Sequence, residues 1–146
     1  MDTPLKDILN TEKTIYEISS ESTLLEAAEK MAKYKVGSLL VMDHHQPQGI
    51  ITERDFLFKV SAHNKNLQTT KVSEIMSKGL IRLHSEQKAK DALKVMTEKR
   101  IRHLPIYNEK EEFLGLLSIG DLAKWATSRY HEKISEVEDL VNYIQQ

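Results

Sequence analysis

Two short stretches of this chain repeat one order of residue types and hold its best candidates for chemistry. Each stretch runs glycine, two apolar residues, a hydroxyl residue, two variable positions and an aspartate, at residues 49–55 and again at 115–121. The two copies lie 66 residues apart. A repeat of this length is too long for a solenoid unit, so it predicts two halves of a small two-lobed domain.

The hydroxyl and acidic residues of each stretch suit two different roles. As a structural pair, Thr52 with Asp55 and Ser118 with Asp121 match the hydroxyl-x-x-acid box that caps a helix and binds no ligand. As a functional pair, they lie where a strand enters a helix and where the helix dipole attracts phosphate. An aspartate there would repel phosphate but accept hydrogen bonds from ribose hydroxyls. One copy favours the capping role, whereas the duplication favours a nucleotide site.

Composition removes several classes of function. The chain has 146 residues, a formal net charge of −1 and no cysteine, which excludes thiol catalysis and thiolate metal sites. No run of Lys and Arg with interleaved aromatic residues predicts a nucleic-acid partner. The longest apolar run, residues 39–42, is too short to span a bilayer, and residues 1–3 do not resemble a signal peptide. We therefore expect a soluble, cytoplasmic protein with no nucleic-acid or membrane partner.

Catalysis finds little support in the sequence. A nucleotide hydrolase using Asp55 or Asp121 as a base is the rival interpretation, but neither residue has a second carboxylate, a Walker loop or a Ser/His/Asp set beside it. The pair His44 and His45 lies in a predicted turn without an obvious third ligand for a metal. We expect no catalytic residues, no metal site and no enzyme.

The elements that must position these residues follow from apolar spacing. Each repeat predicts a β-α-β-β-α unit of mixed α/β (α+β) class, with a short helical turn before it at 4–9 or 71–76. The predicted strands are residues 14–18, 38–42 and 49–51, then 80–83, 103–107 and 113–117. Apolar stripes that include Met31 and Met96 predict the two helices between them, and Thr23 with Glu26 predicts a capping box on the first. Lys88 leaves the second helix without a capping hydroxyl.

We divide the chain into a first repeat at 1–66, a second repeat at 67–130 and a C-terminal amphipathic helix at 131–146. In the tail, an apolar stripe at three- and four-residue steps contains Ile134, Val137, Val141 and Ile144. Two interpretations stay open: the stripe packs back on its own domain, or it forms a dimer contact. Trp125 is expected to pack under the tail.

The duplicated motif, the segment Arg102-His103-Leu104-Pro105-Ile106 and the repeated β-α-β-β-α unit together resemble a pair of cystathionine-β-synthase (CBS) domains, called a Bateman module. The resemblance covers residues 1–130. It implies a regulatory module without an obligatory cofactor, which binds AMP, ADP, ATP or a related adenosyl nucleotide in clefts between the repeats and forms homodimers. Since no catalytic domain is attached, such a module would sense energy state or a metabolite and act on a separate effector protein. A nucleotide-free scaffold is the alternative.

The resemblance also implies roles for single residues. Asp55 and Asp121 would hold riboses, with Thr52 and Ser118 beside them. Strand positions would line the adenine pockets, and the dipeptide before Leu-Pro would lie near the phosphates. The implied ligand-binding residues are Tyr16, Gly37, Ser38, Ile50, Thr52, Arg54, Asp55, Ile81, Arg102, His103, Leu116, Ser118 and Asp121.

The first repeat departs from the pattern of the second. It has Gly37-Ser38 where the second has Arg102-His103, and Arg54 where the second has Gly120. We therefore expect two clefts of unequal affinity. For Arg102 a solvated surface charge, and for His103 a half-buried polar side chain, stay open as alternatives.

Overall fold

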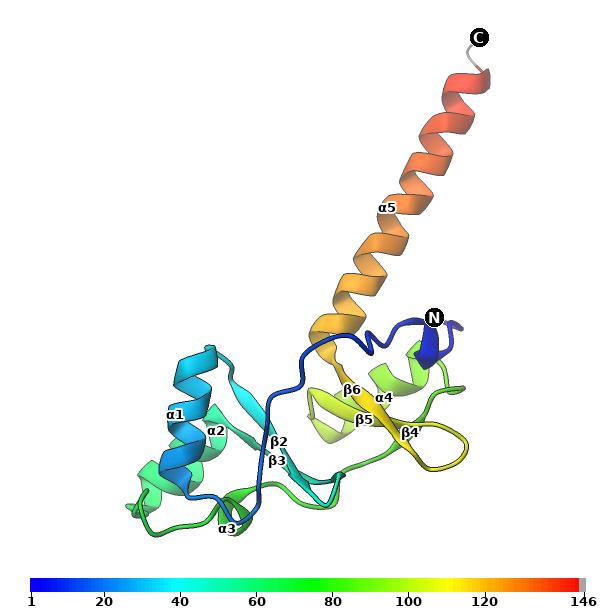
Figure 1. Cartoon of the computed structure of the whole chain (residues 1–146). Helices are drawn as coiled ribbons and strands as arrows, with labels where there is room; N and C mark the ends of the chain where they lie inside the picture. The colour runs from blue at the N-terminus through cyan, green and yellow to red at the C-terminus, as the bar shows by residue number, and fades with distance from the viewer. Residues whose placement is uncertain (145–146) are drawn as a thin grey trace. The chain divides into compact units, whose positions relative to one another are not determined.

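The apolar segments of the two repeats form two three-stranded sheets, one in each repeat. The structure, a computed structural model, describes residues 1–144 (Figure 1). Its contacts divide the chain into a first-repeat unit, Glu12–Arg82, and a second-repeat unit, which joins Met1–Thr11 to the chain from Leu83 onward. Each unit is described by itself below.

The first-repeat unit contains a sheet in the order β1-β2-β3, with β1 parallel to β2 and β2 antiparallel to β3. Helix α1 connects β1 to β2, and three consecutive helical pieces follow β3. The elements are β1 (Glu17–Ile18), α1 (Leu24–Tyr34), β2 (Ser38–Asp43), β3 (Gln46–Thr52), α2 (Glu53–Asp55), the π-helix η2 (Phe56–Val60), the 3₁₀-helix η3 (Ser61–His63) and α3 (Val72–Ile75).

The second-repeat unit has the same sheet with the same strand directions, in the order β4-β5-β6. Its elements are the 3₁₀-helix η1 (Leu5–Asp7), β4 (Leu83–His84), α4 (Ala89–Lys99), β5 (His103–Tyr107), β6 (Phe113–Ser118) and α5 (Ile119–Ile144). Both units therefore confirm the predicted mixed α+β class and the β-α-β-β-α order.

The core of the first-repeat unit forms where α1, α3 and the η2 helix cover the apolar face of the sheet. Leu39, Val41 and Ile51 of the strands are fully buried against Leu24 and Met31 of α1. Burying each large apolar side chain contributes about 1.5–3 kcal/mol, so this cluster is the main stabilising feature of the unit. The prediction that Met31 and Met96 are core residues is confirmed, since both are buried.

The N-terminal capping bonds of α1 and α4 agree with their sequences. Thr23 accepts a hydrogen bond from the amide of Glu26, whose carboxylate accepts one from the amide of Thr23 at 2.8 Å. At Lys88 only half of such a box forms: the carboxylate of Asp91 accepts from the Lys88 amide at 2.9 Å. A lysine ammonium has no acceptor atom, so the reciprocal bond is chemically impossible there.

The first segment of each repeat packs in the unit of the other repeat. At the chain start, the amide of Leu5 donates to the carbonyl of Gln87 at 2.8 Å, and Leu5 is fully buried. In the matching place of the first-repeat unit, the amide of Val72 donates to the carbonyl of Ser22 at 2.8 Å. The sequence boundary at 66/67 and the packing boundaries at 11/12 and 82/83 are therefore different divisions of the chain.

The first strand of each repeat is shorter than predicted. Only Glu17 and Ile18 pair with β2, and only Leu83 and His84 pair with β5. Tyr16 and Ile81 therefore lie outside the strands in which the sequence placed them. The Tyr16 carbonyl still accepts from the Leu40 amide at 3.0 Å, so Tyr16 lies next to the end of β1.

The turn between β2 and β3 contains His44 and His45, as predicted. Both side chains are exposed, and both residues have positive φ angles, 50° and 61°. Two-residue hairpins favour such mirror-image turns because their twist matches that of the strands.

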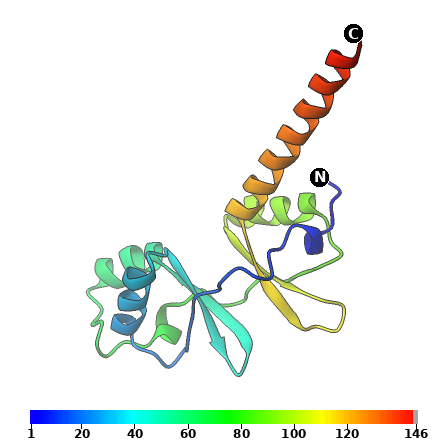
Figure 2. The ribbon, with the colours of Figure 1, turned by 45° about the horizontal axis from the view of Figure 1, so that its top comes forward.

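The C-terminal tail forms the distal part of one 26-residue helix, α5. The predicted helix at 131–146 lies within it, except that residues 145 and 146 fall outside the described part. Every residue from 126 to 144 is exposed, and Figures 1 and 2 show this part of α5 extending away from the β4-β5-β6 sheet. The interpretation in which the stripe packs back on its own domain is therefore wrong. Trp125 is half-buried at the base of the tail.

Each glycine of the duplicated motif lies against the first segment of the other repeat. Substitution of these glycines tests this packing. A Cβ on Gly49 would lie 2.5 Å from the carbonyl oxygen of Ser77, which is backbone, whereas one on Gly115 would meet only the side chain of Leu9, at 3.4 Å. We expect Gly49→Ala to lower the free energy of unfolding by about 1–3 kcal/mol. Gly115→Ala should change it by less than about 1 kcal/mol in either direction. Urea denaturation measures both, and equal effects would contradict this packing.

Candidate functional site: two strand-to-helix corners

The first corner forms where β3 ends at Thr52 and α2 begins. The Thr52 hydroxyl accepts from the amide of Asp55 at 3.3 Å. The Asp55 carboxylate oxygen Oδ2 accepts from the amide of Thr52 at 2.9 Å and from its hydroxyl at 3.2 Å. Asp55 is 7% exposed, one of the few buried polar residues. The predicted capping box is therefore present, and it holds the carboxylate in a fixed position.

The second corner repeats this geometry where β6 enters α5. Oδ2 of Asp121 accepts from the amide of Ser118 at 2.8 Å and from its hydroxyl at 2.7 Å, and the Asp121 amide donates to the hydroxyl at 3.1 Å. Asp121 is half-buried. Both members of the duplicated motif thus cap helices, and the second carboxylate is the more accessible.

The neighbouring strand brings the predicted dipeptides to the same corners. Ser38 pairs with Thr52 across β2 and β3, and His103 pairs with Ser118 across β5 and β6. The carbonyl of the preceding residue completes each corner: that of Gly37 accepts from the Glu53 amide at 3.0 Å.

In the second corner, the Arg102 carbonyl accepts from the Ile119 amide at 2.9 Å. The first corner thus gathers Gly37, Ser38, Thr52 and Asp55, and the second gathers Arg102, His103, Ser118 and Asp121.

A lysine that the sequence analysis did not single out distinguishes the first corner. The ammonium of Lys59 lies 3.0 Å from Oδ1 of Asp55 and donates to the carbonyl of Ile75 at 3.1 Å. The matching residue of the second repeat is Trp125, which has no charge. The aspartate of the first corner is therefore ion-paired by its own chain. Its i,i+4 spacing from Lys59 was the signal in the sequence that could have revealed this.

Other charges separate the corners further. The carboxylate of Glu53 lies against Gly37, 3.2 Å from where a Cβ would stand, and the matching residue of the second corner is the exposed Ile119. The guanidinium of Arg54 lies over the ring of Phe58, 5.7 Å from its centre. An anion at the first corner would therefore meet an extra carboxylate, whereas the second corner has the exposed Arg102 beside it.

The remaining predicted residues lie outside the hydrogen-bond sets of the corners. Tyr16 is half-buried with its ring centre 4.7 Å from that of Tyr34. Ile50 is 8% exposed and its backbone bonds to Ser77. Ile81 is half-buried in the irregular segment before β4, and Leu116 is half-buried in β6 opposite Pro105.

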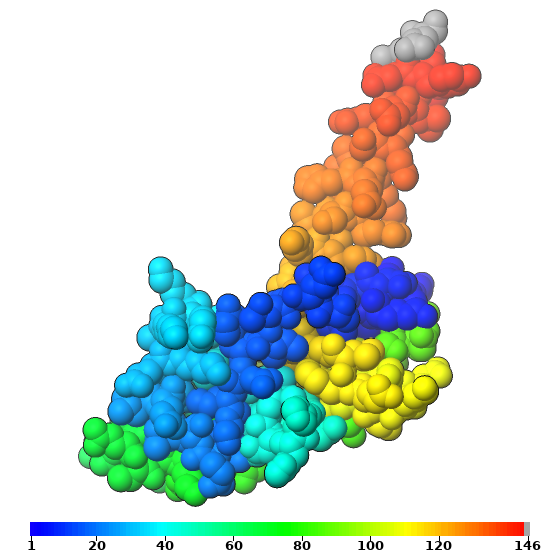
Figure 3. Space-filling view, in the orientation of Figure 1, coloured from blue at the N-terminus to red at the C-terminus, as the bar shows by residue number. Residues whose placement is uncertain are grey.

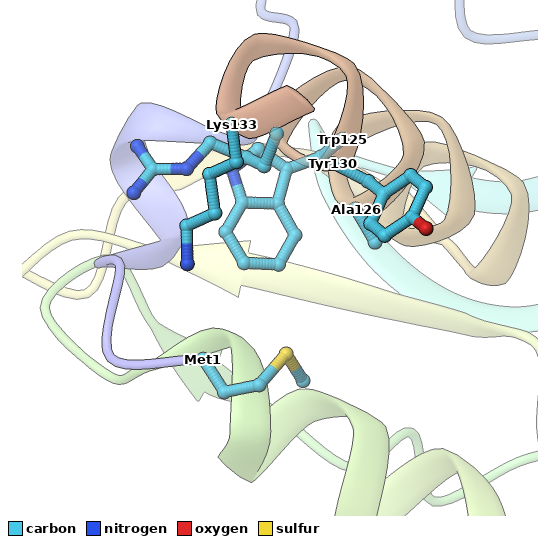
Figure 4. Close-up of a pocket in the computed structure, with 6 residues that line it drawn as sticks. Met1, Trp125, Ala126, Tyr130 and Lys133 are labelled. Atoms are coloured by element: carbon cyan, nitrogen blue, oxygen red, sulfur yellow. The ribbon is translucent and has the colours of Figure 1, made fainter. Parts of the chain in front are cut away.

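The structure also contains a shallow hollow beside α5 (Figure 4). The indole of Trp125 and the side chain of Lys133 extend toward Met1, while Tyr130 lies on the other side of the helix (Figure 4). Its lining residues are Met1, Trp125, Ala126, Arg129, Tyr130 and Lys133, and none of them belongs to either corner.

No group of three His, Asp or Glu side chains among residues 1–144 is placed to hold a metal ion. No helix in this range combines the length and the apolar character that crossing a membrane requires.

The duplicated corners match a known family. The CBS-domain profile covers residues 5–62 and 72–128 of the chain. The protein belongs to the CBS-domain family. CBS pairs are generally regulatory and often bind adenosine ligands, and proteins of this kind are generally not enzymes.

Relatives of known sequence and structure agree with this assignment. The mitochondrial CBS domain-containing protein CBSX3 of Arabidopsis thaliana is 36% identical over 132 residues, which are 87% of this chain and 62% of that protein. The chain thus spans less than two thirds of that curated relative. A CBS protein from Burkholderia ambifaria, described as a putative signal-transduction protein, has a TM-score of 0.78 and 34% identity, covering 86% of this chain and 95% of its own.

A third CBS relative is described as an assembly. The hexameric CBS-CP12 protein from bloom-forming cyanobacteria has a TM-score of 0.69 and 27% identity, and the match covers 84% of this chain and 71% of that one.

The ion pair of the first corner predicts a stability effect. Lys59→Gln leaves the buried Asp55 carboxylate without its cation, so we expect the free energy of unfolding to fall by about 1 kcal/mol, a value reduced for the partial exposure of the lysine. The matched control is Lys94→Gln, which removes an exposed i,i+4 contact to Glu98 at 4.0 Å and should cost close to nothing. Urea denaturation compares the two, and indistinguishable losses would show that the Asp55 pair contributes nothing.

Proposed function

We propose that this protein is a regulatory CBS pair that binds an adenosine nucleotide at its strand-to-helix corners and acts on a separate effector protein. The observation that carries the proposal is the duplicated cap, in which an aspartate is fixed at a helix start beside the first residues of the neighbouring strand. A fixed acceptor is the feature that a ribose site needs, because two hydroxyls can donate to one carboxylate.

Capping and ribose binding are compatible at one carboxylate. An ionised carboxylate has about four lone-pair sites, and the amide and hydroxyl of Ser118 use two of those of Asp121. The amide and hydroxyl of Ser118 orient Asp121 before any ligand arrives, so binding costs little conformational entropy. Under this proposal the cap is the support of the site and not an alternative to it.

We propose that the second corner binds more tightly than the first. Arg102 and His103 give it basic groups for phosphate, and its aspartate is the more accessible one. The first corner has Glu53 against Gly37, and its Asp55 is already paired with Lys59. Unequal charge therefore supports unequal affinity for AMP, ADP or ATP.

The proposed mode of regulation, oligomeric state and location are based on membership of the family. Nucleotide binding would stabilise one arrangement of the module by its differential affinity, and a homodimer would transmit this change to the effector. The description of the CBS-CP12 relative as hexameric supports assembly of this chain. We place the protein in the cytoplasm as an energy or metabolite sensor, with no obligatory cofactor.

The ribose role of Asp121 can be tested by calorimetry with AMP, ADP, ATP, NADH and S-adenosylmethionine. Asp121→Ala should weaken binding of the tightest ligand by about 1–3 kcal/mol, because a charged acceptor is lost. The matched control is Asp91→Ala, which removes a capping carboxylate of the same kind from α4. Normal affinity in a folded Asp121→Ala protein would refute the ribose assignment, and flat heats for all five ligands with the unmodified protein would favour a nucleotide-free scaffold.

The regulatory role predicts no turnover. Incubation with ATP and Mg²⁺ should release no phosphate above the rate of a protein-free sample, because neither aspartate has a Walker loop or a Ser/His/Asp set beside it in the sequence. Phosphate release that disappears in Asp55→Ala or Asp121→Ala would instead support the hydrolase interpretation.

A further inference from the structure

The distal part of α5 presents one continuous apolar stripe to solvent. Figure 3 shows this part of the helix, in orange to red, standing clear of the sheet that precedes it. The exposed fractions along the stripe are 66% for Tyr130, 38% for Ile134, 59% for Val137, 45% for Val141 and 73% for Ile144. Two further apolar residues, Leu140 and Tyr143, are exposed outside the stripe. A continuous stripe of large apolar residues on an exposed helix marks an interaction surface.

The stripe repeats with the period of a coiled coil. Its steps alternate between four and three residues from Tyr130 to Ile144, which assigns Ile134 and Val141 to heptad position a. Tyr130, Val137 and Ile144 then occupy position d. Ser135, Glu136 and Asp139 fall at the outer positions b, c and f, which suit solvent.

We propose that this segment forms a parallel coiled coil with the same segment of a second copy of the chain. All five residues at the a and d positions are apolar, as the seam of a coiled coil requires. The inference goes beyond the nucleotide site and holds whether or not a ligand binds there.

Charge complementarity identifies the partner and the direction. Lys133 is at position g and Glu138 is at the e position five residues later, the two positions that meet across a parallel dimer. Each helix supplies one residue of each kind, so a second copy makes this pair twice. In an antiparallel arrangement g meets g, which would place Lys133 beside Leu140 instead.

Helix stability provides a second argument for a partner. Isolated helices of about 15 residues are marginal in water, and most helices in proteins depend on packing of an apolar face. No side chain from residue 126 to 144 is buried in the chain itself. Pairing with a second copy would bury the a and d residues and provide the packing that this segment lacks. The stripe spans only about two heptads, so we expect weak, concentration-dependent pairing.

The absence of cysteine makes the geometry testable in the full-length chain by single substitutions. Val137→Cys and Ile144→Cys place a thiol at two d positions about 10 Å apart along the helix. In a parallel, in-register pair each thiol faces its own copy, so both variants should form disulfide-linked dimers in a glutathione redox buffer. The control, Asp139→Cys at position f, should stay monomeric in the same redox buffer, as measured by intact-mass analysis without added reductant.

The outcomes separate the alternatives. Linking of only one d variant indicates an antiparallel pair, because an antiparallel register cannot place both thiols within the 4.4–6.8 Å between Cα atoms that a disulfide requires. Linking of neither variant, or equal linking of Asp139→Cys, shows that the segment does not pair through this stripe. Each of these results overturns the proposal, and none of them bears on nucleotide binding.

The charge pair can be tested in the Val137→Cys background. Lys133→Glu brings two carboxylates together at each g–e contact and should lower the equilibrium constant for linking by about tenfold. The double variant Lys133→Glu with Glu138→Lys restores opposite charges and should link within about twofold of the parent. A double variant as weak as the single one would exclude the parallel pairing.

Discussion

The exchange of first segments between the repeats is the constraint on which the two units depend. Leu5 is fully buried in the second-repeat unit, and Val72 is fully buried in the first. Each is held by backbone hydrogen bonds that a side-chain substitution does not remove. The second-repeat unit is discontinuous, since it joins Met1–Thr11 to the chain from Leu83 onward, and the first-repeat unit, Glu12–Arg82, includes the first segment of the second repeat. The repeats are therefore joined by shared cores as well as by the linker.

The same exchange explains a glycine that looks functional in the sequence. Gly49 opens the first duplicated stretch, yet the structure gives it a steric reason, because the backbone of Ser77 crosses it too closely for any Cβ. The hydroxyl and aspartate that follow have a second structural reason, because they cap a helix. The residues of the motif therefore have a structural role, which is to form the corner. A ligand role for Asp121 adds to this and uses a carboxylate whose position the fold has already fixed.

Asymmetry between the corners arises from side chains outside the motif. Lys59 pairs with Asp55 and bonds to the carbonyl of Ile75, whereas Trp125 occupies the matching place and lines a hollow under the tail. In the sequence, Gly37-Ser38 and Arg54 are the residues that predict unequal sites. The structure adds two further charge differences between the corners, Lys59 and Glu53. It places the guanidinium of Arg54 over the ring of Phe58. These charge differences are a further reason to expect unequal affinity.

The sequence by itself determined the repeat, the α+β class, the order of elements and both capping boxes, because these depend on apolar period and on residues three positions apart. Only the tertiary structure decided which segment completes which unit, where the short first strands end, and that the tail leaves its own domain. Each of these depends on contacts between residues far apart in the chain, such as Leu5 with Gln87, which no local pattern encodes. The stripe on α5 was visible in the sequence, but its exposure was not.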